Sequence, residues 1–161
     1  MEIIKSRKKE KFIENASKEA LKSPMLFRHG CVAVYGGKQI ASGYNYHRTY
    51  SKDKSILKDY TCSMHAEIDC IRKIKNSRFK NKLKNICLYV VQINKDCEFK
   101  NSQPCSTCTV VLKDNNIKKV YYTVTDFSGT GFSLVCCKID NIVPKDTFGT
   151  TFLKSTLPRR K

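Results

Sequence analysis

Two short segments carry the residue types that bind metal ions and move protons: His65-Ala66-Glu67 and Pro104-Cys105-Ser106-Thr107-Cys108. Cys105 and Cys108 are three positions apart at a predicted helix start, so both thiols face one side of that helix. A helix N-terminus lowers the pKa of a thiol and so favours the thiolate that metal ions bind. His65 opens another predicted helix and supplies an imidazole. One imidazole and two thiolates, with a fourth position left open, are typical of a catalytic zinc site.

Glu67 lies two residues after His65 and can reach the open position without binding the metal itself. Zinc acidifies a bound water, and a nearby carboxylate can accept the proton. The alternative is a closed structural site, in which Cys62, three residues before His65, completes a Cys₃His tetrahedron. Glu67 favours the open site, because a structural site needs no proton acceptor.

Hydrophobic periodicity predicts the elements that must position these segments. Helices are expected over residues 10–22, 65–75 and 105–115, and strands over 31–35, 38–43, 86–93, 119–124 and 132–139, with a long loop over 44–63. Gly36-Gly37 between the first two strands is a hairpin signal, since both glycines accept positive φ.

The order of these elements predicts how the two metal-binding segments meet. Parallel strands need helical crossovers, and crossovers are right-handed. The helices after Ser63 and Pro104 should therefore start at the same edge of the sheet, where open α/β sheets bind ligands. His65 and Cys105 then come together although 40 positions separate them. The connection from Val124 to Phe132 is too short for a crossover helix, which predicts antiparallel final strands.

These motifs, together with Gly43-Tyr44-Asn45, resemble the cytidine/deoxycytidylate deaminase superfamily of zinc-dependent nucleobase deaminases, which includes the tRNA adenosine deaminases. The resemblance runs from about Phe12 to Ile139. It implies a three-layer α/β fold, with a five-stranded mixed sheet and helices on both faces. It also implies one Zn²⁺ ion held by His65, Cys105 and Cys108, with Glu67 as the catalytic proton shuttle.

The resemblance also implies substrate contacts. Asn45 follows the second strand, where the family places an asparagine against the sugar or base, and the backbone of Ala66 would meet the edge of the base. His47, two residues later, is a candidate phosphate contact or an ordinary surface histidine. Phe127 is a candidate for stacking on a base or a turn residue that caps the core.

The implied reaction is hydrolytic conversion of cytosine to uracil in a nucleotide or nucleoside such as dCMP, CMP or cytidine. By the same resemblance, antiparallel final strands are the arrangement of small free-nucleoside enzymes. One alternative is a deaminase acting on tRNA adenosine or on cytosine in single-stranded DNA or RNA, with tyrosines and lysines of the 44–63 loop stacking and pairing with the strand. Another is a zinc-bearing binding or assembly protein that has the fold without turnover.

Composition bounds the remaining expectations. With 161 residues and 40% hydrophobic residues, we expect a single domain over 1–161 with loosely ordered basic ends at 1–9 and 154–161. The net charge of +17 suits a phosphorylated substrate, RNA or single-stranded DNA, or else a solvated lysine-rich surface. The nine cysteines lack the regular spacing of a disulfide-bonded domain, which predicts buried thiols and metal ligands in a reducing compartment. We expect an intracellular protein, cytoplasmic or nuclear, without membrane contact, and a homo-oligomer by the resemblance.

Overall fold

The computed structural model describes residues 2–47, 63–126 and 131–143. The chain forms β1 (Glu2–Ile4), α1 (Arg7–Ala20), β2 (Arg28–Tyr35), β3 (Lys38–Tyr44), β4 (Tyr46–His47), β5 (Ser63–Met64), α2 (Ala66–Lys75), η1 (Leu83–Asn85), β6 (Cys87–Ile93), β7 (Phe99–Lys100), α3 (Ser106–Asp114), β8 (Lys119–Thr125), β9 (Phe132–Lys138) and η2 (Ile139–Asn141). Each helix and strand expected from periodicity is present, with ends shifted by a few residues.

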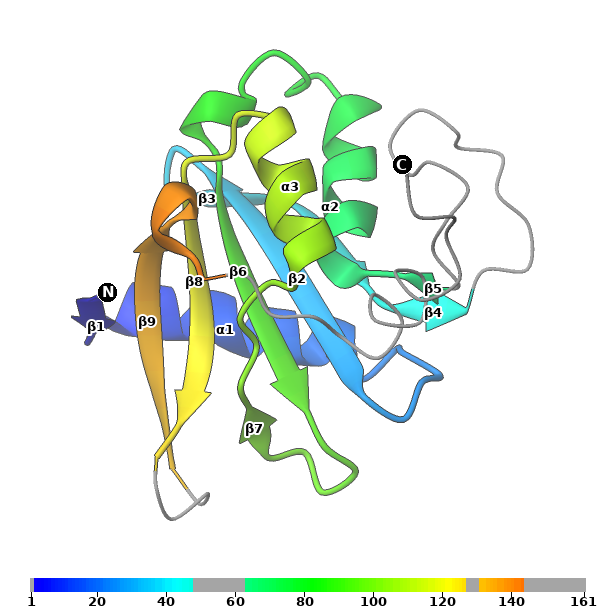
Figure 1. The fold of residues 1–161 in the computed structure, drawn as a ribbon, viewed down its shortest axis with the longest axis vertical. Helices are drawn as coiled ribbons and strands as arrows, with labels where there is room; N and C mark the ends of the chain where they lie inside the picture. Colours follow the sequence, from blue (N-terminus) through cyan, green and yellow to red (C-terminus); the bar gives the residue numbers. More distant parts are fainter. Residues whose placement is uncertain (1, 48–62, 127–130, 144–161) are drawn as a thin grey trace, which may run out of the picture.

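The three-layer α/β arrangement with helices on both faces of a mixed sheet is confirmed (Figure 1). Helix α1 covers one face, and its buried residues Phe12, Ile13, Ala16 and Ala20 join the core on that side. Helices α2 and α3 lie side by side on the other face, over a larger core that includes Ile71, Ile74 and Leu112. Alternate residues of the central strands supply both cores, because successive side chains of a strand point to opposite faces.

The expected number of five strands is wrong, because the main sheet has seven. Its order is β1-β9-β8-β6-β2-β3, and β7 pairs with β6. The extra strands β1 and β7 have three and two residues. Such lengths are too short to give a hydrophobic period, so only pairing with a neighbour defines them.

The connections agree with those expected. Gly36 and Gly37 form the turn between β2 and β3 with φ values of +57° and +76°. Strands β6 and β8 are parallel and are joined through α3, whereas β8 and β9 are antiparallel. Helices α2 and α3 consequently begin near the same edge of the sheet.

Of the N-terminal end at 1–9, for which we expected loose order, residues 2–9 include β1 and the first residues of α1. Ile3 pairs with Val135 of β9, and α1 already begins at Arg7. The edge of β9 offers unpaired backbone groups, and the apolar Ile3-Ile4 segment satisfies them. The other end at 154–161 lies outside the described residues, as do Cys62 and Phe127.

The eight cysteines in the described ranges are all free thiols, and Cys31 and Cys70 are fully buried in the core. Among the same residues, no helix combines the length and the apolar character that a membrane crossing requires.

Candidate active site

The starts of α2 and α3 bring His65, Cys105 and Cys108 together, with their ligand atoms within 4.8 Å of one another. His65 Nδ1 lies 3.5 Å from Cys105 Sγ and 3.2 Å from Cys108 Sγ. His65 and Cys105 are the N-cap residues of α2 and α3, and Cys108 lies on the first turn of α3. Two helix N-termini therefore present one imidazole and two thiols to a common point.

This donor set fits one zinc ion. Tetrahedral coordination with ordinary Zn–N and Zn–S lengths separates nitrogen and sulfur ligands by about 3.6 Å. The two nitrogen–sulfur distances here, 3.5 and 3.2 Å, are close to that separation. Three protein ligands leave a fourth position for water or substrate, as in catalytic zinc sites.

The electrostatics of the cluster favour a bound cation. A hydrogen bond from Cys108, together with His65 and the backbone N–H of Cys108, lowers the pKa of Cys105 to about 4. The hydrogen bond with Cys105 and burial raise the pKa of the Cys108 thiol. Burial opposes protonation of His65, but its hydrogen bond to Cys105 and nearby negative charge raise its pKa overall. A thiolate is thus already present, and a divalent cation would displace the remaining protons from the ligands.

Glu67 is a buried carboxyl group beside this cluster. Only 5% of the residue is exposed, and its Oε2 accepts a hydrogen bond from Cys108 Sγ at 3.5 Å. Burial raises the pKa of Glu67 above the usual value for glutamate. Met64 and Ile68, close to Glu67 in the sequence, form a buried apolar cluster with the two cysteines.

Gly43 lets α2 approach the sheet closely enough to place His65 and Glu67. A Cβ at Gly43 would lie 2.6 Å from the carbonyl oxygen of Ala66 and 2.8 Å from the backbone nitrogen of Cys70. Sequence reasoning missed this role. The available signal was a glycine inside a predicted strand, which often marks close backbone approach.

Asp69 ties the same helix to the segment that carries Asn45. It is 1% exposed, and it pairs with Arg72 at 2.9 Å and Lys73 at 3.3 Å. It also accepts hydrogen bonds from the backbone of Tyr44 and the hydroxyl of Tyr46, each at 3.4 Å. Sequence reasoning missed Asp69 as well, although an acid on the apolar face of a helix suggests a buried partner.

Ser102 fixes the approach to Cys105. Its hydroxyl donates to the carbonyl of Val90 on β6 and accepts from the backbone N–H of Thr123 on β8, each at 2.7 Å. The backbone of Ser102 also donates to Thr123 at 3.0 Å. Ser102 thus bridges two parallel strands where they diverge, and Pro104 and Cys105 follow from this fixed point.

Asn45 is 6% exposed, and its side chain joins the start of β2 to the end of β3. Its Oδ1 accepts from the backbone N–H of His29 at 2.8 Å, and its Nδ2 donates to the carbonyl of Phe27 at 2.6 Å. Nδ2 also lies 3.4 Å from Nδ1 of His29. Met25 Sδ also lies 3.4 Å from Nδ2. The contact of Asn45 with a substrate stays a prediction.

Of the other expected substrate contacts, the structure describes Ala66 and His47 but not Phe127. Ala66 is fully buried as the first residue of α2. His47 is exposed on β4 and is paired with Ser63, two residues before His65. Phe127 and the alternative fourth ligand Cys62 lie outside the described residues.

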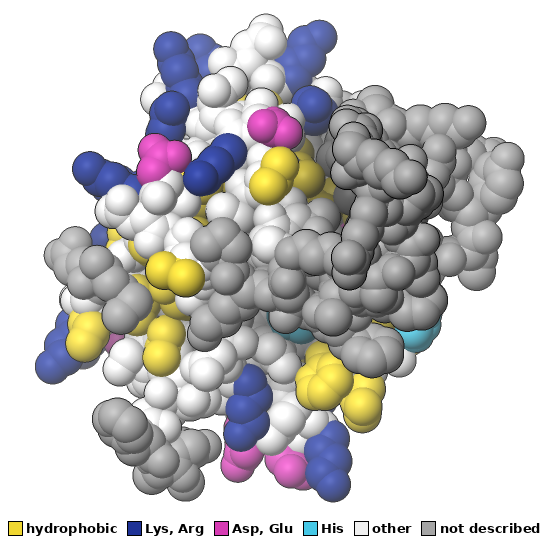
Figure 2. All heavy atoms as spheres, in the orientation of Figure 1, with side chains coloured by type: hydrophobic (Ala, Val, Ile, Leu, Met, Phe, Trp, Pro, Cys, Tyr) yellow, Lys and Arg dark blue, Asp and Glu magenta, His cyan; other side chains and the backbone are white. Residues whose placement is uncertain are grey.

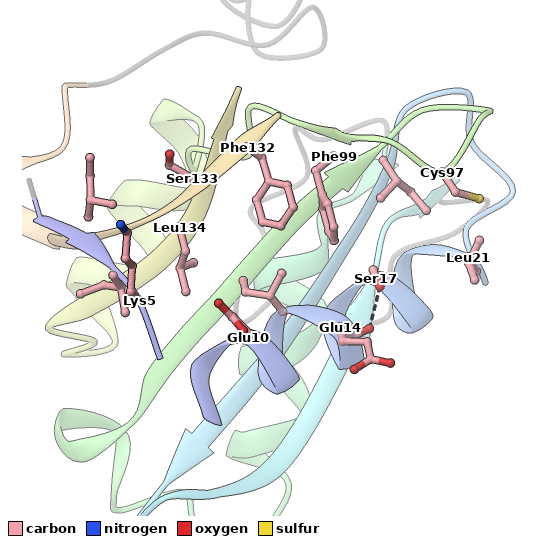
Figure 3. A pocket seen from close by; sticks show the side chains of 14 residues that line it. Lys5, Glu10, Glu14, Ser17, Leu21, Cys97, Phe99, Phe132, Ser133 and Leu134 are labelled. Atoms are coloured by element: carbon pink, nitrogen blue, oxygen red, sulfur yellow. Dashed lines mark hydrogen bonds between the residues drawn. The ribbon is translucent and has the colours of Figure 1, made fainter. Parts of the chain in front are cut away.

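A cavity of about 700 Å³ lies on the α1 face of the sheet, away from the metal-binding cluster (Figure 3). Its wall is largely apolar, with Leu21, Phe99 and Phe132 labelled around it, and Glu10 and Glu14 of α1 lie at its side. The only grouping of three or more metal-ligating side chains within the described ranges is His65, Cys105 and Cys108. We therefore assign the candidate active site to the metal-binding cluster and not to this cavity.

Residues 6–124 match the family model of the cytidine and deoxycytidylate deaminase zinc-binding region. No curated protein sequence matches the chain.

Solved structures share the fold at low sequence identity. Cytidine deaminase from Burkholderia pseudomallei aligns with a TM-score of 0.59 and 15% identity over 86% of this chain and 98% of that one. The dCMP deaminase from cyanophage S-TIM5 in apo form aligns with a TM-score of 0.52 and 20% identity over 74% of this chain and 84% of that one. Cytidine deaminase from Mycobacterium leprae aligns with a TM-score of 0.50 and 12% identity over 84% of this chain and 97% of that one.

Proposed function

Because this chain belongs to the cytidine and deoxycytidylate deaminase family, we propose that it hydrolyses the amine of cytosine in a nucleotide or nucleoside, giving uracil and ammonia. In this proposal residues 1–161 act as one domain. His65, Cys105 and Cys108 hold the zinc ion, and Glu67 is the catalytic residue that moves protons.

The roles of the side chains follow from their positions. Zinc held by these three ligands supplies the Lewis acidity that makes water a nucleophile near neutral pH. Glu67 accepts the proton of the attacking water and passes it to the ring nitrogen beside the amine-bearing carbon. It next takes the proton of the hydroxyl that the water has left on that carbon and gives it to the amine, so that ammonia leaves as the C–N bond breaks and the C=O bond forms. One carboxylate thus acts as base and then as acid.

The buried Glu67 carboxyl carries the proposal. A protein that used the zinc only to stabilise its fold would need the three ligands and would gain nothing from an acid buried beside them. Burial of a carboxyl without a compensating role costs free energy. The raised pKa of Glu67 brings the group toward the range in which a carboxyl both accepts and donates protons near neutral pH.

The antiparallel pairing of β8 with β9 supports a free nucleotide or nucleoside as substrate. This arrangement resembles that of small free-nucleoside deaminases. The contacts expected from Asn45, Ala66, His47 and Phe127 would then recognise the sugar, base and phosphate.

The test compares Glu67→Gln with the native protein, both loaded with zinc. The substrates are dCMP, CMP, cytidine, single-stranded DNA and tRNA, and the readouts are ammonia released and the base formed. Glu67→Gln should keep zinc and lose about 10²–10⁴-fold in turnover, since it keeps the shape of the side chain but not its basicity. Glu14→Gln, on the exposed surface of α1, is the matched control and should leave turnover unchanged.

Native turnover of free cytosine substrates would support the proposal. Turnover of only tRNA or single-stranded DNA would replace the substrate but keep the reaction. Zinc-loaded native protein that releases no ammonia from any of the five substrates would overturn it.

A further inference from the structure

A group of exposed cations lies at the end of α2 that is farther from His65, Cys105 and Cys108. Between Cys70 and Lys95 the sequence contains no acidic residue. From the last residue of α2 onward this stretch carries five exposed cations: Lys75, Arg78, Lys80, Lys82 and Lys84. We call these five residues, together with Lys119 and Lys138, the basic end. Figure 2 shows Lys and Arg side chains gathered at the top of the view, above α2 and α3.

The strand register places the second part of the basic end at the same end of the sheet, on the face that α1 covers. Cys87, three residues after Lys84, is paired with Lys119 of β8, and Lys119 is paired with Lys138 of β9. Like charges directly opposite each other on antiparallel strands repel and destabilise the pair. An anion lying across Lys119 and Lys138 would relieve that repulsion.

Most of these cations have no ion-pair partner among the described residues. Within the described ranges, no ion pair involves Lys75, Lys80, Lys82 or Lys84. By contrast, Lys18 and Lys22 of α1 pair with Glu14 and Glu19. The charges of the basic end are therefore free to meet an external anion.

We propose that the basic end binds the phosphate backbone of a double-helical nucleic acid, independently of the deaminase site. A row of unpaired cations on one connection and two strand ends suits a regular line of phosphates, with affinity arising from counterion release. Such contacts carry no base information, so the binding would not depend on sequence.

The aromatic residues of this end favour a duplex over a single strand. Binding of single strands relies on aromatic side chains that stack on bases. Phe79 is partly buried here, with the Arg78 guanidinium 4.9 Å from its ring centroid and Tyr35 at 5.7 Å. Neither ring is among the exposed large hydrophobic side chains of the described residues.

The same observation argues against a membrane surface as the partner. Stable attachment to a bilayer combines cations with apolar side chains that insert among the lipids. The exposed large apolar residues in the described ranges are Ile3, Leu21, Leu26, Phe27, Val110, Phe132 and Val143, none of which lies on the α2–β6 connection.

The basic end and the metal-binding cluster lie at opposite ends of α2. The ten residues of this helix span about 15 Å. The proposed duplex site therefore does not include the start of α2, where His65 and Glu67 lie. The bound nucleic acid would anchor the protein and not serve as its substrate.

The test measures binding of the zinc-loaded full chain to RNA and DNA duplexes of about 20 base pairs at a series of salt concentrations. The variant Lys80→Gln/Lys82→Gln/Lys84→Gln should weaken binding at least tenfold near 0.1 M salt. It should also reduce the slope of log K against log salt by about 2 to 3, because three phosphate contacts are lost. Deamination of a free nucleotide should be unchanged in this variant.

The matched control is Lys5→Gln/Lys11→Gln/Lys95→Gln, which removes three exposed positive charges outside the basic end. It should keep both the affinity and the salt slope close to native values. Equal losses in the two triple variants would overturn the proposal, because net charge alone would then explain the binding. Tighter binding to a single-stranded oligonucleotide or to anionic phosphatidylserine vesicles than to the duplexes would overturn it as well, as would no duplex binding near 0.1 M salt.

Discussion

The Glu67 carboxyl and the two thiols beside it show how single side chains acquire reactivity from their neighbours. Cys105 and Cys108 have the same side chain, yet the pKa of the first is lowered and that of the second is raised. The difference arises because Cys105 accepts hydrogen bonds from Cys108 and His65, whereas Cys108 donates its thiol proton to Cys105 and is completely buried. The spacing of the two residues was evident in the sequence, but this division of charge depends on the hydrogen bond between the thiols and on burial.

His29 is a partly buried histidine near the site whose lowered pKa should affect the stability of the protein. Burial and the nearby charge of His65 lower the pKa of His29 to about 4, while hydrogen bonding to Gln92 and the charge of Cys105 act in the opposite direction. Asn45 Nδ2 also faces its ring, at 3.4 Å. His29 is therefore neutral in the folded protein at pH values where it is protonated in the unfolded chain.

We expect His29 to make the free energy of unfolding fall as pH decreases. Because the pKa of His29 is lower in the folded protein than in the unfolded chain, its effect on stability is absent above about pH 6.5. Between about pH 6.5 and pH 4 the free energy of unfolding should fall, by at most about 3 kcal/mol. Urea unfolding at several pH values should show this decline in the native protein and a smaller one in His29→Gln. An equal decline in the native protein and in His29→Gln between about pH 6.5 and 4 would show that His29 does not cause it.

The helices bearing the ligands depend on contacts that their own sequences do not reveal. Helix α2 touches β3 where Gly43 leaves room, and Asp69 connects the helix to the segment after β3. Helix α3 follows from Ser102, which is fixed between β6 and β8. The positions of the three metal ligands therefore depend on how the two helices contact the sheet as well as on the two sequence motifs.

Gly43→Ala should displace the first turn of α2. The added Cβ would meet the backbone of Ala66 and Cys70, which cannot rotate away as a side chain could. We expect a loss of about 1–3 kcal/mol in the free energy of unfolding and at least a tenfold loss in zinc affinity. Urea unfolding and zinc competition titrations measure the two effects.

Ser42→Ala, at the neighbouring position, is the control for this variant, because it adds no atom next to α2. It should bind zinc as the native protein does. Native zinc affinity in Gly43→Ala would show that the helix start does not depend on this close approach.

The molecule as a whole should depend on its metal ion for stability. His65, Cys105 and Cys108 come from two helices, so a shared ion links elements that are 40 positions apart in the chain. An ion present at 100 to 1,000 times its dissociation constant stabilises the folded state by about 3 to 4 kcal/mol. Removing zinc with a chelator should therefore lower Tm by several degrees.

Thermal unfolding with and without chelator measures this effect, with zinc content determined in parallel. Cys108→Ser is the control, because a protein with a weakened site should show little response to the chelator. A native protein that carries one zinc ion per chain and melts at the same temperature after its removal would disprove the linkage.

The sequence by itself determined the ligand types, their placement at two helix starts and the order of the main elements. Hydrophobic periodicity and motif spacing are local properties of the sequence. They are strong enough to predict helices over residues 10–22, 65–75 and 105–115. Antiparallel β8 and β9 followed from a connection too short for a crossover.

Only the tertiary structure decided which remote groups meet. The pairing of β1 with β9, the approach of α2 over Gly43, and the hydrogen bonds of Tyr44 and Tyr46 to Asp69 all join segments that are distant in the chain. Their cause is packing and register between elements, which no local pattern of residues encodes. For the same reason the sequence indicated a large positive charge, whereas the position of the basic end relative to the zinc ligands emerged only from the fold.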